Sequence, residues 1–463
     1  MASRKDQLHS YQFMLQRAIS ALIMRETDPA QSPLRRGVGA AFIGVMVTVI
    51  VAAAFGIYGL LTKTGSNRWQ FDNAVVVEKE TGATFVYLGG GLTPTVNLTS
   101  ALLISGQSAA KTFTVPRNSL TDVPRGRPVG IVGAPASLPD TKHLLTGAWA
   151  ACRLPAQDAA GQPTVATALL VGRVAAGGTP VGDRSLYVRG RTADGESADY
   201  LVWHGHRYRL TAPKAAAALF TSGTAPIDVG GAWLNTLPEG DPIGRIAVPK
   251  AGNSSTKVPG RTVGDVVVDR RDASGTFYLV VDDGLARLTP LQMDLLKSER
   301  AVTPREIPPA EIAAVPVSTR LASSSPTAQR APERRPTPLE VPAEGSVCAT
   351  FDARGGAAPT LAVSSGADAD TGAIVTAKQT TDGAMLADRV SVPPGRAAIV
   401  RDRESGTYSL VTDQGKRFPV ESGEALAALG YTDADAVTMP RALLGRLPTG
   451  PALTRADAVT PIG

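Results

Sequence analysis

One uninterrupted apolar run stands out near the N-terminus. Residues 37–61, GVGAAFIGVMVTVIVAAAFGIYGLL, contain no charge and no proline. At about 1.5 Å per residue they make a helix of about 37 Å, enough to cross a hydrocarbon core of about 30 Å with some tilt. A cleaved signal peptide has a shorter leader and a shorter apolar core. The run therefore predicts a single transmembrane helix.

The segment before this run has helical periodicity. Ser3 stands three residues ahead of Asp6, a capping-box pattern, and apolar residues then recur at helical spacing opposite Gln12 and Gln16. The apolar stripe consists of Leu8, Tyr11, Leu15, Ala18, Ile19 and Leu22. Residues 1–36 offer this stripe no globular partner, so we expect an amphipathic helix that contacts the membrane surface or another protein.

The charges beside the apolar run predict its orientation. Arg35 and Arg36 directly precede the run, and residues 1–36 carry six Lys and Arg against three acids, whereas only Lys63 and Arg68 follow closely. The positive-inside rule then places the N-terminus in the cytoplasm, with both arginines at the cytoplasmic membrane surface or a partner. We expect a single-pass protein of the cell membrane, most of which lies outside the cytoplasm.

The chain contains only two cysteines, Cys152 and Cys348. In a reducing compartment two distant thiols are usually unrelated, whereas outside the cytoplasm a lone pair is more often a disulfide. Because the predicted topology places both residues outside, we expect a disulfide between them.

Four copies of one pattern follow the apolar run. Each copy has an apolar stretch, a charged turn with glycine, a second apolar stretch with an aromatic residue, and a closing glycine, which is typical of two strands joined by a turn. A short helix-like patch comes next. The copies begin at Val75, Leu186, Val266 and Ala398.

A second signature ends every copy: an apolar residue, Pro or Gly, three positions, Leu or Ile, two positions, Val or Leu, and Pro. The matches are Val115, Pro116, Leu120, Val123, Pro124; Val229, Gly230, Leu234, Leu237, Pro238; Ile307, Pro308, Ile312, Val315, Pro316; and Met439, Pro440, Leu444, Leu447, Pro448. Four matches at five positions indicate an internal repeat.

The stretches inserted between copies resemble each other. Thr164 and Thr360 each lie 12 residues past a cysteine, and each follows a proline. This similarity predicts two half-domains that pair across the disulfide. The fold class expected is α+β, with a single transmembrane helix followed by an elongated extracytoplasmic region of four small α/β repeats around a pseudo-twofold, β-rich central domain.

The expected boundaries follow from these patterns. Residues 319–344 are rich in Pro, Ser, Ala and Arg, which predicts a flexible linker. The segments are 1–36, cytoplasmic helix and linker; 37–61, transmembrane helix; 70–140, repeat 1; 141–182, central domain, first half; 183–245, repeat 2; 261–318, repeat 3; 345–395, central domain, second half; and 396–455, repeat 4.

Composition narrows the function further. The chain is 43% hydrophobic but only 5% aromatic, with 47 Gly and 35 Pro, which suits many short strands and turns. Its formal charge is +6, and the basic residues are scattered rather than gathered beside aromatics. This pattern argues against nucleic-acid binding.

No catalytic, cofactor or metal motif is readable. The glycines of residues 89–91 lack the Gly-Lys of a phosphate loop, and neither GxSxG nor HExxH occurs. His204 and His206 could share a strand face, but no third ligand stands nearby. Asp282 and Asp283 could form an acid pair, yet the other copies have no carboxylate pair in this slot, which favours a hairpin turn closed by glycine.

The stretch SYQFMLQRAISALIMRETDPAQSPLRR, residues 10–36, together with the four repeats and the cysteine pair, resembles the EccB family of type VII (ESX) secretion systems in actinobacteria. The resemblance covers essentially the full length. It implies a core subunit of an inner-membrane complex that works with the EccC ATPase, EccD, EccE and the mycosin protease, and that pairs with copies of itself. Some family members are labelled ATPases.

The function expected is that of a structural subunit that anchors and oligomerises a secretion complex on the extracytoplasmic side and supports protein export. No cofactor is predicted. Two alternatives stay open. Nucleotide hydrolysis by residues 62–463 would favour a membrane-anchored hydrolase or ATPase, and sedimentation with cell-wall material would favour a cell-envelope-binding repeat protein.

Overall fold

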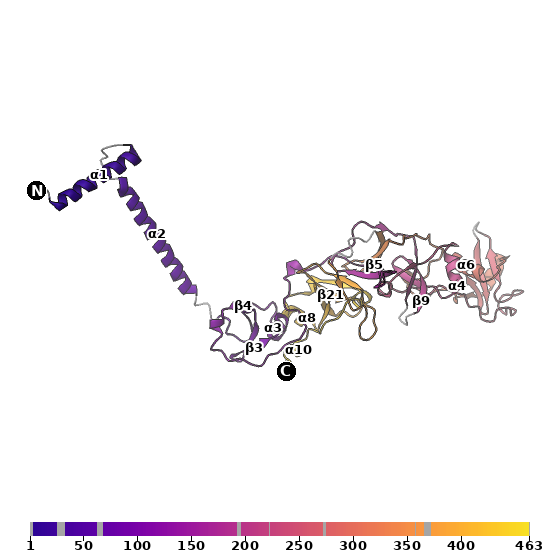
Figure 1. Cartoon of the computed structure of the whole chain (residues 1–463). Helices are drawn as coiled ribbons and strands as arrows, with labels where there is room; N and C mark the ends of the chain where they lie inside the picture. Colours follow the sequence, from indigo (N-terminus) through magenta and orange to yellow (C-terminus); the bar gives the residue numbers. More distant parts are fainter. Residues whose placement is uncertain are drawn as a thin grey trace. The chain divides into compact units, whose positions relative to one another are not determined.

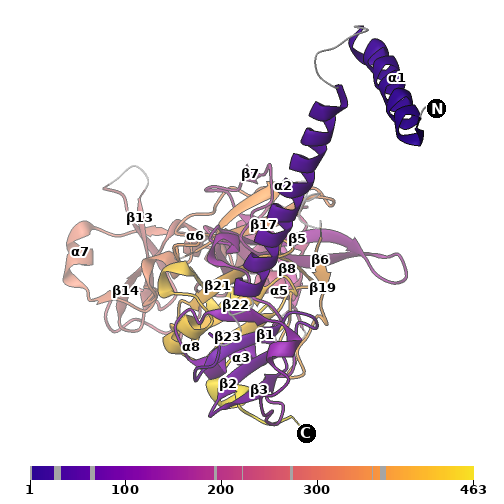
Figure 2. The same cartoon turned by 90° about the vertical axis from the view of Figure 1, so that its left-hand side faces the viewer.

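The computed structural model describes residues 3–25, 33–62, 68–191, 196–221, 223–271, 275–356, 358–364 and 372–462. The chain divides into two units. The first comprises Met1–Phe71 with Val115–Asp122, and the second comprises Asp72–Thr114 with Val123–Gly463. Figures 1 and 2 show the chain in two views.

Two helices open the chain, α1 (Arg4–Met24) and α2 (Pro33–Thr62). The predicted capping box at the start of α1 is confirmed, since the Ser3 hydroxyl accepts from the Lys5 amide and the Asp6 carboxylate accepts from the Ser3 amide. α2 begins four residues before the apolar run, and its first residue is a proline, whose fixed φ suits that position. The stretch Gly37–Gly59 is long and apolar enough to cross a membrane.

Four small sheets carry the repeats, with strand orders β3-β2-β1-β4, β10-β9-β8-β11, β15-β12-β13-β14-β16 and β23-β22-β21-β24. In each, three strands run antiparallel in sequence. In repeats 2, 3 and 4 a later strand returns parallel to the first after a short helix.

The elements of repeat 1 are β1 (Ala74–Glu78), β2 (Thr84–Leu88), β3 (Gly91–Thr95), α3 (Leu98–Ser105) and β4 (Thr112–Val115). Those of repeat 2 are β8 (Leu186–Arg191), β9 (Ser197–Trp203), β10 (His206–Arg209), α4 (Pro213–Leu219), β11 (Ile227–Asp228) and α5 (Gly231–Leu234). Those of repeat 3 are β12 (Val266–Asp269), β13 (Thr276–Val281), β14 (Gly284–Arg287), α6 (Pro290–Glu299), β15 (Arg305–Glu306), α7 (Pro309–Ala314) and β16 (Val317–Ser318). Those of repeat 4 are β21 (Ala397–Asp402), β22 (Tyr408–Thr412), β23 (Arg417–Val420), α8 (Gly423–Ala428), β24 (Ala436–Met439), α9 (Arg441–Leu444) and α10 (Arg455–Ala458).

The first Pro or Gly of the signature caps a short helix in every repeat. Pro116, Gly230, Pro308 and Pro440 are the N-cap residues, with φ angles of −68°, −67°, −62° and −69°. Proline is fixed near φ of about −65°, so it suits this position without strain. Repeat 2 has glycine because a Cβ on Gly230 would lie 2.6 Å from the Thr167 hydroxyl oxygen.

The last proline of the signature closes each sheet through its carbonyl group. In every repeat this oxygen accepts a hydrogen bond of 2.8–3.0 Å from an amide in the third strand. The pairs are Pro124 with Leu92, Pro238 with Arg207, Pro316 with Leu285, and Pro448 with Arg417. The chain then continues beside the third strand in parallel. The signature therefore encodes one turn geometry used four times.

A seven-stranded sheet lies at the centre, in the order β19-β20-β6-β5-β17-β18-β7. Its strands are β5 (Trp149–Gln157), β6 (Pro163–Leu170), β7 (Thr179–Pro180), β17 (Ser346–Phe351), β18 (Thr360–Ser364), β19 (Ile374–Val375) and β20 (Arg389–Ser391). The hairpins β5–β6 and β17–β18 meet antiparallel, with Cys152 directly opposite Cys348, and the two form a disulfide. The fold is the expected one, with four repeats around a pseudo-twofold centre.

The outer strands of the central sheet are exchanged between its halves. β7, from the first half, pairs with β18 of the second half, and β20, from the second half, pairs with β6 of the first. The disulfide is therefore one of several links across the pseudo-twofold axis.

The repeats pack in pairs. Repeats 1 and 4 share one hydrophobic core, in which α3 contacts both α8 and α10, and repeats 2 and 3 share another through α4 and α6 (Figure 1). A pseudo-twofold that relates repeat 1 to repeat 3 and repeat 2 to repeat 4 relates these two pairs as well. Repeats 2 and 4 also bury residues against the central sheet.

Residues 319–344, which the composition predicts to be a flexible linker, make defined contacts with repeat 2. The Asp241 carboxylate accepts hydrogen bonds of 2.5 Å from the Ser323 and Ser325 hydroxyls, and its amide donates to the Gln329 carbonyl at 2.8 Å. Such contacts with hydroxyls and backbone carbonyls leave no hydrophobic periodicity, so the sequence pattern did not predict them.

Candidate functional site

The apolar stripe of α1 is largely uncovered within the described residues. Leu8, Tyr11, Leu15 and Leu22 are 55%, 64%, 47% and 84% exposed, and Ile19 is half-buried. An isolated helix with this much apolar surface in water lacks its natural environment. The exposed surface is also wider than predicted, because Phe13 and Met14 are 59% and 71% exposed although neither belongs to the stripe.

α2 exposes apolar side chains all around. Phe42, Ile43 and Phe55 are each more than half exposed. The one hydroxyl near its middle, Thr48, donates to the Gly44 carbonyl at 2.8 Å, so it brings no unsatisfied donor into an apolar medium. Arg35 and Arg36 belong to the first turns of this helix, and their side chains lie outside the described residues.

The two faces of the central sheet have different surroundings because side chains alternate along each strand. Trp149 and Ala151 point into the core shared with repeats 2 and 4. Cys152 and Cys348 point to the opposite face, where alanines and two leucines surround the buried disulfide. The cysteine pair therefore joins the two half-domains without taking part in the packing of the repeats.

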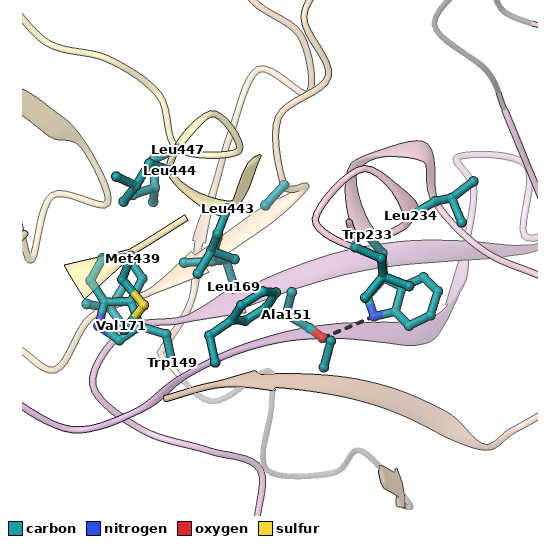
Figure 3. Packing of buried hydrophobic residues seen from close by; sticks show 14 of the residues in the cluster. Trp149, Ala151, Leu169, Val171, Trp233, Leu234, Met439, Leu443, Leu444 and Leu447 are labelled. Atoms are coloured by element: carbon teal, nitrogen blue, oxygen red, sulfur yellow. Dashed lines mark hydrogen bonds between the residues drawn. The ribbon is translucent and has the colours of Figure 1, made fainter. Parts of the chain in front are cut away.

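The signature helices of repeats 2 and 4 dock on the same face of the central sheet (Figure 3). Trp233 of α5 is fully buried, and its indole N–H donates to the Ala151 carbonyl at 3.1 Å. On this same face, Leu443 and Leu444 of α9 pack into the core that also contains Trp149. The residues that define the repeat thus also attach two repeats to the centre.

The carboxylate pair in repeat 3 is ion-paired. Asp282 lies 3.2 Å from the Lys250 ammonium and 2.9 Å from the Arg320 guanidinium, and Asp283 lies 3.4 Å from the same guanidinium. The hydrogen bond from Lys250, aided by the charge of Arg320, holds the pKa of Asp282 below its usual value. The pair fastens the hairpin to two neighbouring segments.

The hairpin turns differ from the predicted alignment in one respect. In repeats 1 and 3 the closing glycines, Gly91 and Gly284, are already the first strand residues after a two-residue turn, whereas Gly205 and Gly415 lie in the turns with φ of 74° and 68°. A side chain on Gly284 would collide with the Pro316 carbonyl. Close approach to the closing proline explains the glycines of repeats 1 and 3, and Gly284 also has a φ of 151° that favours glycine.

The two histidines of repeat 2 have separate partners. The His204 ring lies 3.0 Å from the Asp183 carboxylate, and the buried His206 ring lies 3.0 Å from the His204 carbonyl. Among the described residues, no group of three His, Cys, Asp or Glu could hold a metal ion.

The sequence pattern did not lead us to expect a buried carboxylate at the end of the first strand of a repeat. Glu78, Asp269 and Asp402 occupy this position in repeats 1, 3 and 4, and each is at most 6% exposed. Asp402 accepts hydrogen bonds from the amide of Ser405 and from the guanidinium of Arg441. The signal available in the sequence was an acidic residue at the end of each of these apolar strands.

Comparisons with known proteins cover the whole chain. The family model for "Type VII secretion system ESX-1, transport TM domain B" matches residues 1–462. The chain is 29% identical to the ESX-2 secretion system ATPase EccB2 of Mycobacterium tuberculosis, across 99% of this chain and 94% of that protein. It is 28% identical to the ESX-3 secretion system ATPase EccB3 of Mycolicibacterium smegmatis, across 98% and 90% of the two chains.

Two solved structures from ESX complexes are also similar to this chain. A chain of an intact ESX-5 inner membrane complex superposes with a TM-score of 0.63 at 27% identity, covering 100% of this chain and 96% of that one. The EccB3 dimer from the ESX-3 core complex gives a TM-score of 0.62 at 26% identity, covering 84% and 100%. The chain belongs to the EccB family of type VII (ESX) secretion systems.

Proposed function

We propose that the chain is a structural core subunit of a type VII secretion membrane complex. Its helix α2 anchors the complex in the membrane, and its repeats associate with further copies of the chain. The main support is that this chain is similar, along its full length, to a chain of an intact ESX inner membrane complex. The dimer of a relative supports the self-association.

The orientation and partners are part of this proposal. The arginines before α2 favour a cytoplasmic N-terminus, so the repeats and the disulfide face the extracytoplasmic side. The exposed stripe of α1 would then contact the bilayer or cytoplasmic parts of the complex. The partners we propose are EccC, EccD, EccE and the mycosin protease.

We also propose that the chain itself hydrolyses no nucleotide, although relatives carry the name ATPase. Residues 89–91, the most glycine-rich stretch, form the turn between β2 and β3 and the first residue of β3, and are not followed by the Gly-Lys of a phosphate loop. Nucleotide turnover by the purified full chain that disappears on a defined substitution would overturn this part.

Co-purification tests the function. The full chain, tagged and expressed at its native level, should bring the other secretion subunits with it in mild detergent. Tyr11→Glu with Leu15→Glu places two charges in the apolar stripe and should reduce the recovery of the subunits that α1 contacts. His9→Glu with Ser10→Glu places two acidic residues at exposed polar positions outside the stripe and should not. A chain that purifies alone would contradict the proposal.

A further inference from the structure

A groove of about 1060 Å³ separates the β5–β6 hairpin from the outer edge of the repeat 2 sheet. The hairpin lines one side with residues 155–157 and 163–165, and β11 lines the other. Figure 2 shows β5 and β6 running together into this hairpin.

The edge of β11 offers backbone groups to this groove. The Val229 amide donates to the Arg189 carbonyl of β8 at 2.8 Å. Backbone groups alternate in direction along a strand, so the amide and carbonyl of Asp228 point away from β8. The Asp228 carbonyl accordingly accepts from the Arg153 side chain at 3.0 Å, on the groove side.

The pseudo-equivalent edge in repeat 4 is covered by an added strand. Thr438 precedes the signature in repeat 4 as Asp228 does in repeat 2. Its amide donates to the Ala353 carbonyl at 3.0 Å, and Arg354 forms a parallel bridge with it. The segment after β17 thus adds to the edge of β24.

The difference in hairpin length explains why the same does not happen at β11. Pairing of β17 with β18 ends at Thr350 and Thr360, which frees the following residues to reach repeat 4. β5 stays paired with β6 as far as Gln157 and Pro163. The residues that would cover β11 are therefore held in the hairpin, and the groove marks the place of the strand that is lacking.

The charge of the groove indicates what would fill it. Four arginines line it, Arg153, Arg189, Arg191 and Arg389, against two carboxylates, Asp228 and Glu344. Arg189 is paired with Asp199, and Arg153 is buried against backbone carbonyls, while Arg191 is exposed at the end of β8. With Arg189 paired, three arginines remain against two carboxylates, and an added strand with an acidic side chain would complement this excess of positive charge.

We propose that this groove is a docking site for an extended acidic segment of another protein of the complex, which adds as a strand to the edge of β11. The inference rests on the proposed function, because it needs an assembled complex. In it, the Asp228 amide donates to the incoming backbone, and Arg191 pairs with an acidic side chain.

Hydrogen exchange on the assembled complex tests this directly. The Asp228 amide should exchange at least about tenfold more slowly in the complex than in the isolated full chain, because it becomes hydrogen-bonded. Equal exchange in both would overturn the inference and leave the proposed function standing. Failure to obtain any complex would instead overturn both.

Two matched substitutions separate strand addition from other binding. Asp228→Ala keeps the amide N–H and removes one carboxylate from the groove, so partner recovery should be at least as high as with the parent chain. Asp228→Pro removes the N–H at an edge position where proline is tolerated, and should lose the partner. Arg191→Glu should also reduce partner recovery, whereas Lys297→Glu, exposed on repeat 3, should not. Equal behaviour of the alanine and proline variants would contradict a strand at this edge.

Discussion

At the scale of single residues, the repeat is specified by a few positions with a backbone role. The N-cap proline supplies a fixed φ, and the closing proline supplies a carbonyl acceptor for the third strand. Gly230 is the exception, and its reason is contact with Thr167 of the central sheet. Specialisation of repeat 2 is thus visible in one residue.

The contact at Gly230 predicts that a substitution at Thr167 compensates for a substitution at Gly230. Gly230→Ala should lower the free energy of unfolding by about 1–3 kcal/mol, since the new Cβ overpacks against the Thr167 hydroxyl. Thr167→Ala removes that hydroxyl and should restore most of the loss in the double variant. Denaturation of the full chain in detergent, followed by tryptophan fluorescence, measures both. Equal losses in the single and double variants would show that the contact is not the cause.

The buried carboxylate of Asp402 should make the folding stability of the chain sensitive to acid. Burial raises its pKa, but hydrogen bonds from the Ser405 amide and the Arg441 guanidinium outweigh burial and hold the pKa below its usual value. The folded state therefore binds a proton less readily than the unfolded state, whose Asp titrates near about pH 3.9. The stabilisation is present above that pH and is lost as the pH falls through the folded pKa.

Asp402→Asn should accordingly lower the free energy of unfolding by about 1–3 kcal/mol at pH 7, with the difference from the parent chain shrinking below about pH 4. Asp122→Asn, at an exposed carboxylate, is the control and should change little at either pH. A loss that is the same at pH 7 and pH 3 would show that the charge of Asp402 is not what stabilises the repeat.

At the scale of elements, periodicity and repetition predicted much of the fold. The apolar run and the stripe from Leu8 to Leu22 indicated the two N-terminal helices, and the four signatures indicated the four small sheets. The exchange of β7 and β20 was not predictable, because pairing between strands far apart in sequence leaves no mark on two- or three-residue strands. The contacts of Asp241 with Ser323 and Ser325 were missed because hydrogen bonds between polar side chains leave no hydrophobic periodicity in the sequence.

The disulfide lies between elements, so its removal tests how the halves hold together. It closes a span of 196 residues, for which the chain-entropy model gives about 5 kcal/mol. Cys152→Ala with Cys348→Ala should lower the free energy of unfolding by about 2–5 kcal/mol. Because β7 and β20 also cross between the halves, the variant should still fold.

Far-ultraviolet circular dichroism and denaturation of the full chain measure both expectations. An unchanged stability would show that the strand exchange alone fixes the central sheet. Loss of all folded signal in the variant would show that the exchanged strands contribute less than their pairing suggests.

At the scale of the whole molecule, one chain combines an apolar helix able to span a membrane with four repeats on a disulfide-linked centre. Residues 10–36 and the repeats indicated the EccB family from the sequence, and the family model that matches residues 1–462 confirms that interpretation. The groove beside β11 could not be predicted, because it depends on the unequal lengths of two hairpins in the folded state.

The proposed role as an oligomerising core subunit requires that two copies of this chain occupy one particle. Two differently tagged full-length copies, expressed together at native level, are solubilised in mild detergent, and one tag is isolated. We expect the second tag to be recovered with it, in a particle much heavier than one 47.9 kDa chain and containing other secretion subunits. Recovery of the first tag alone, as a single 47.9 kDa chain in its detergent micelle, would contradict it.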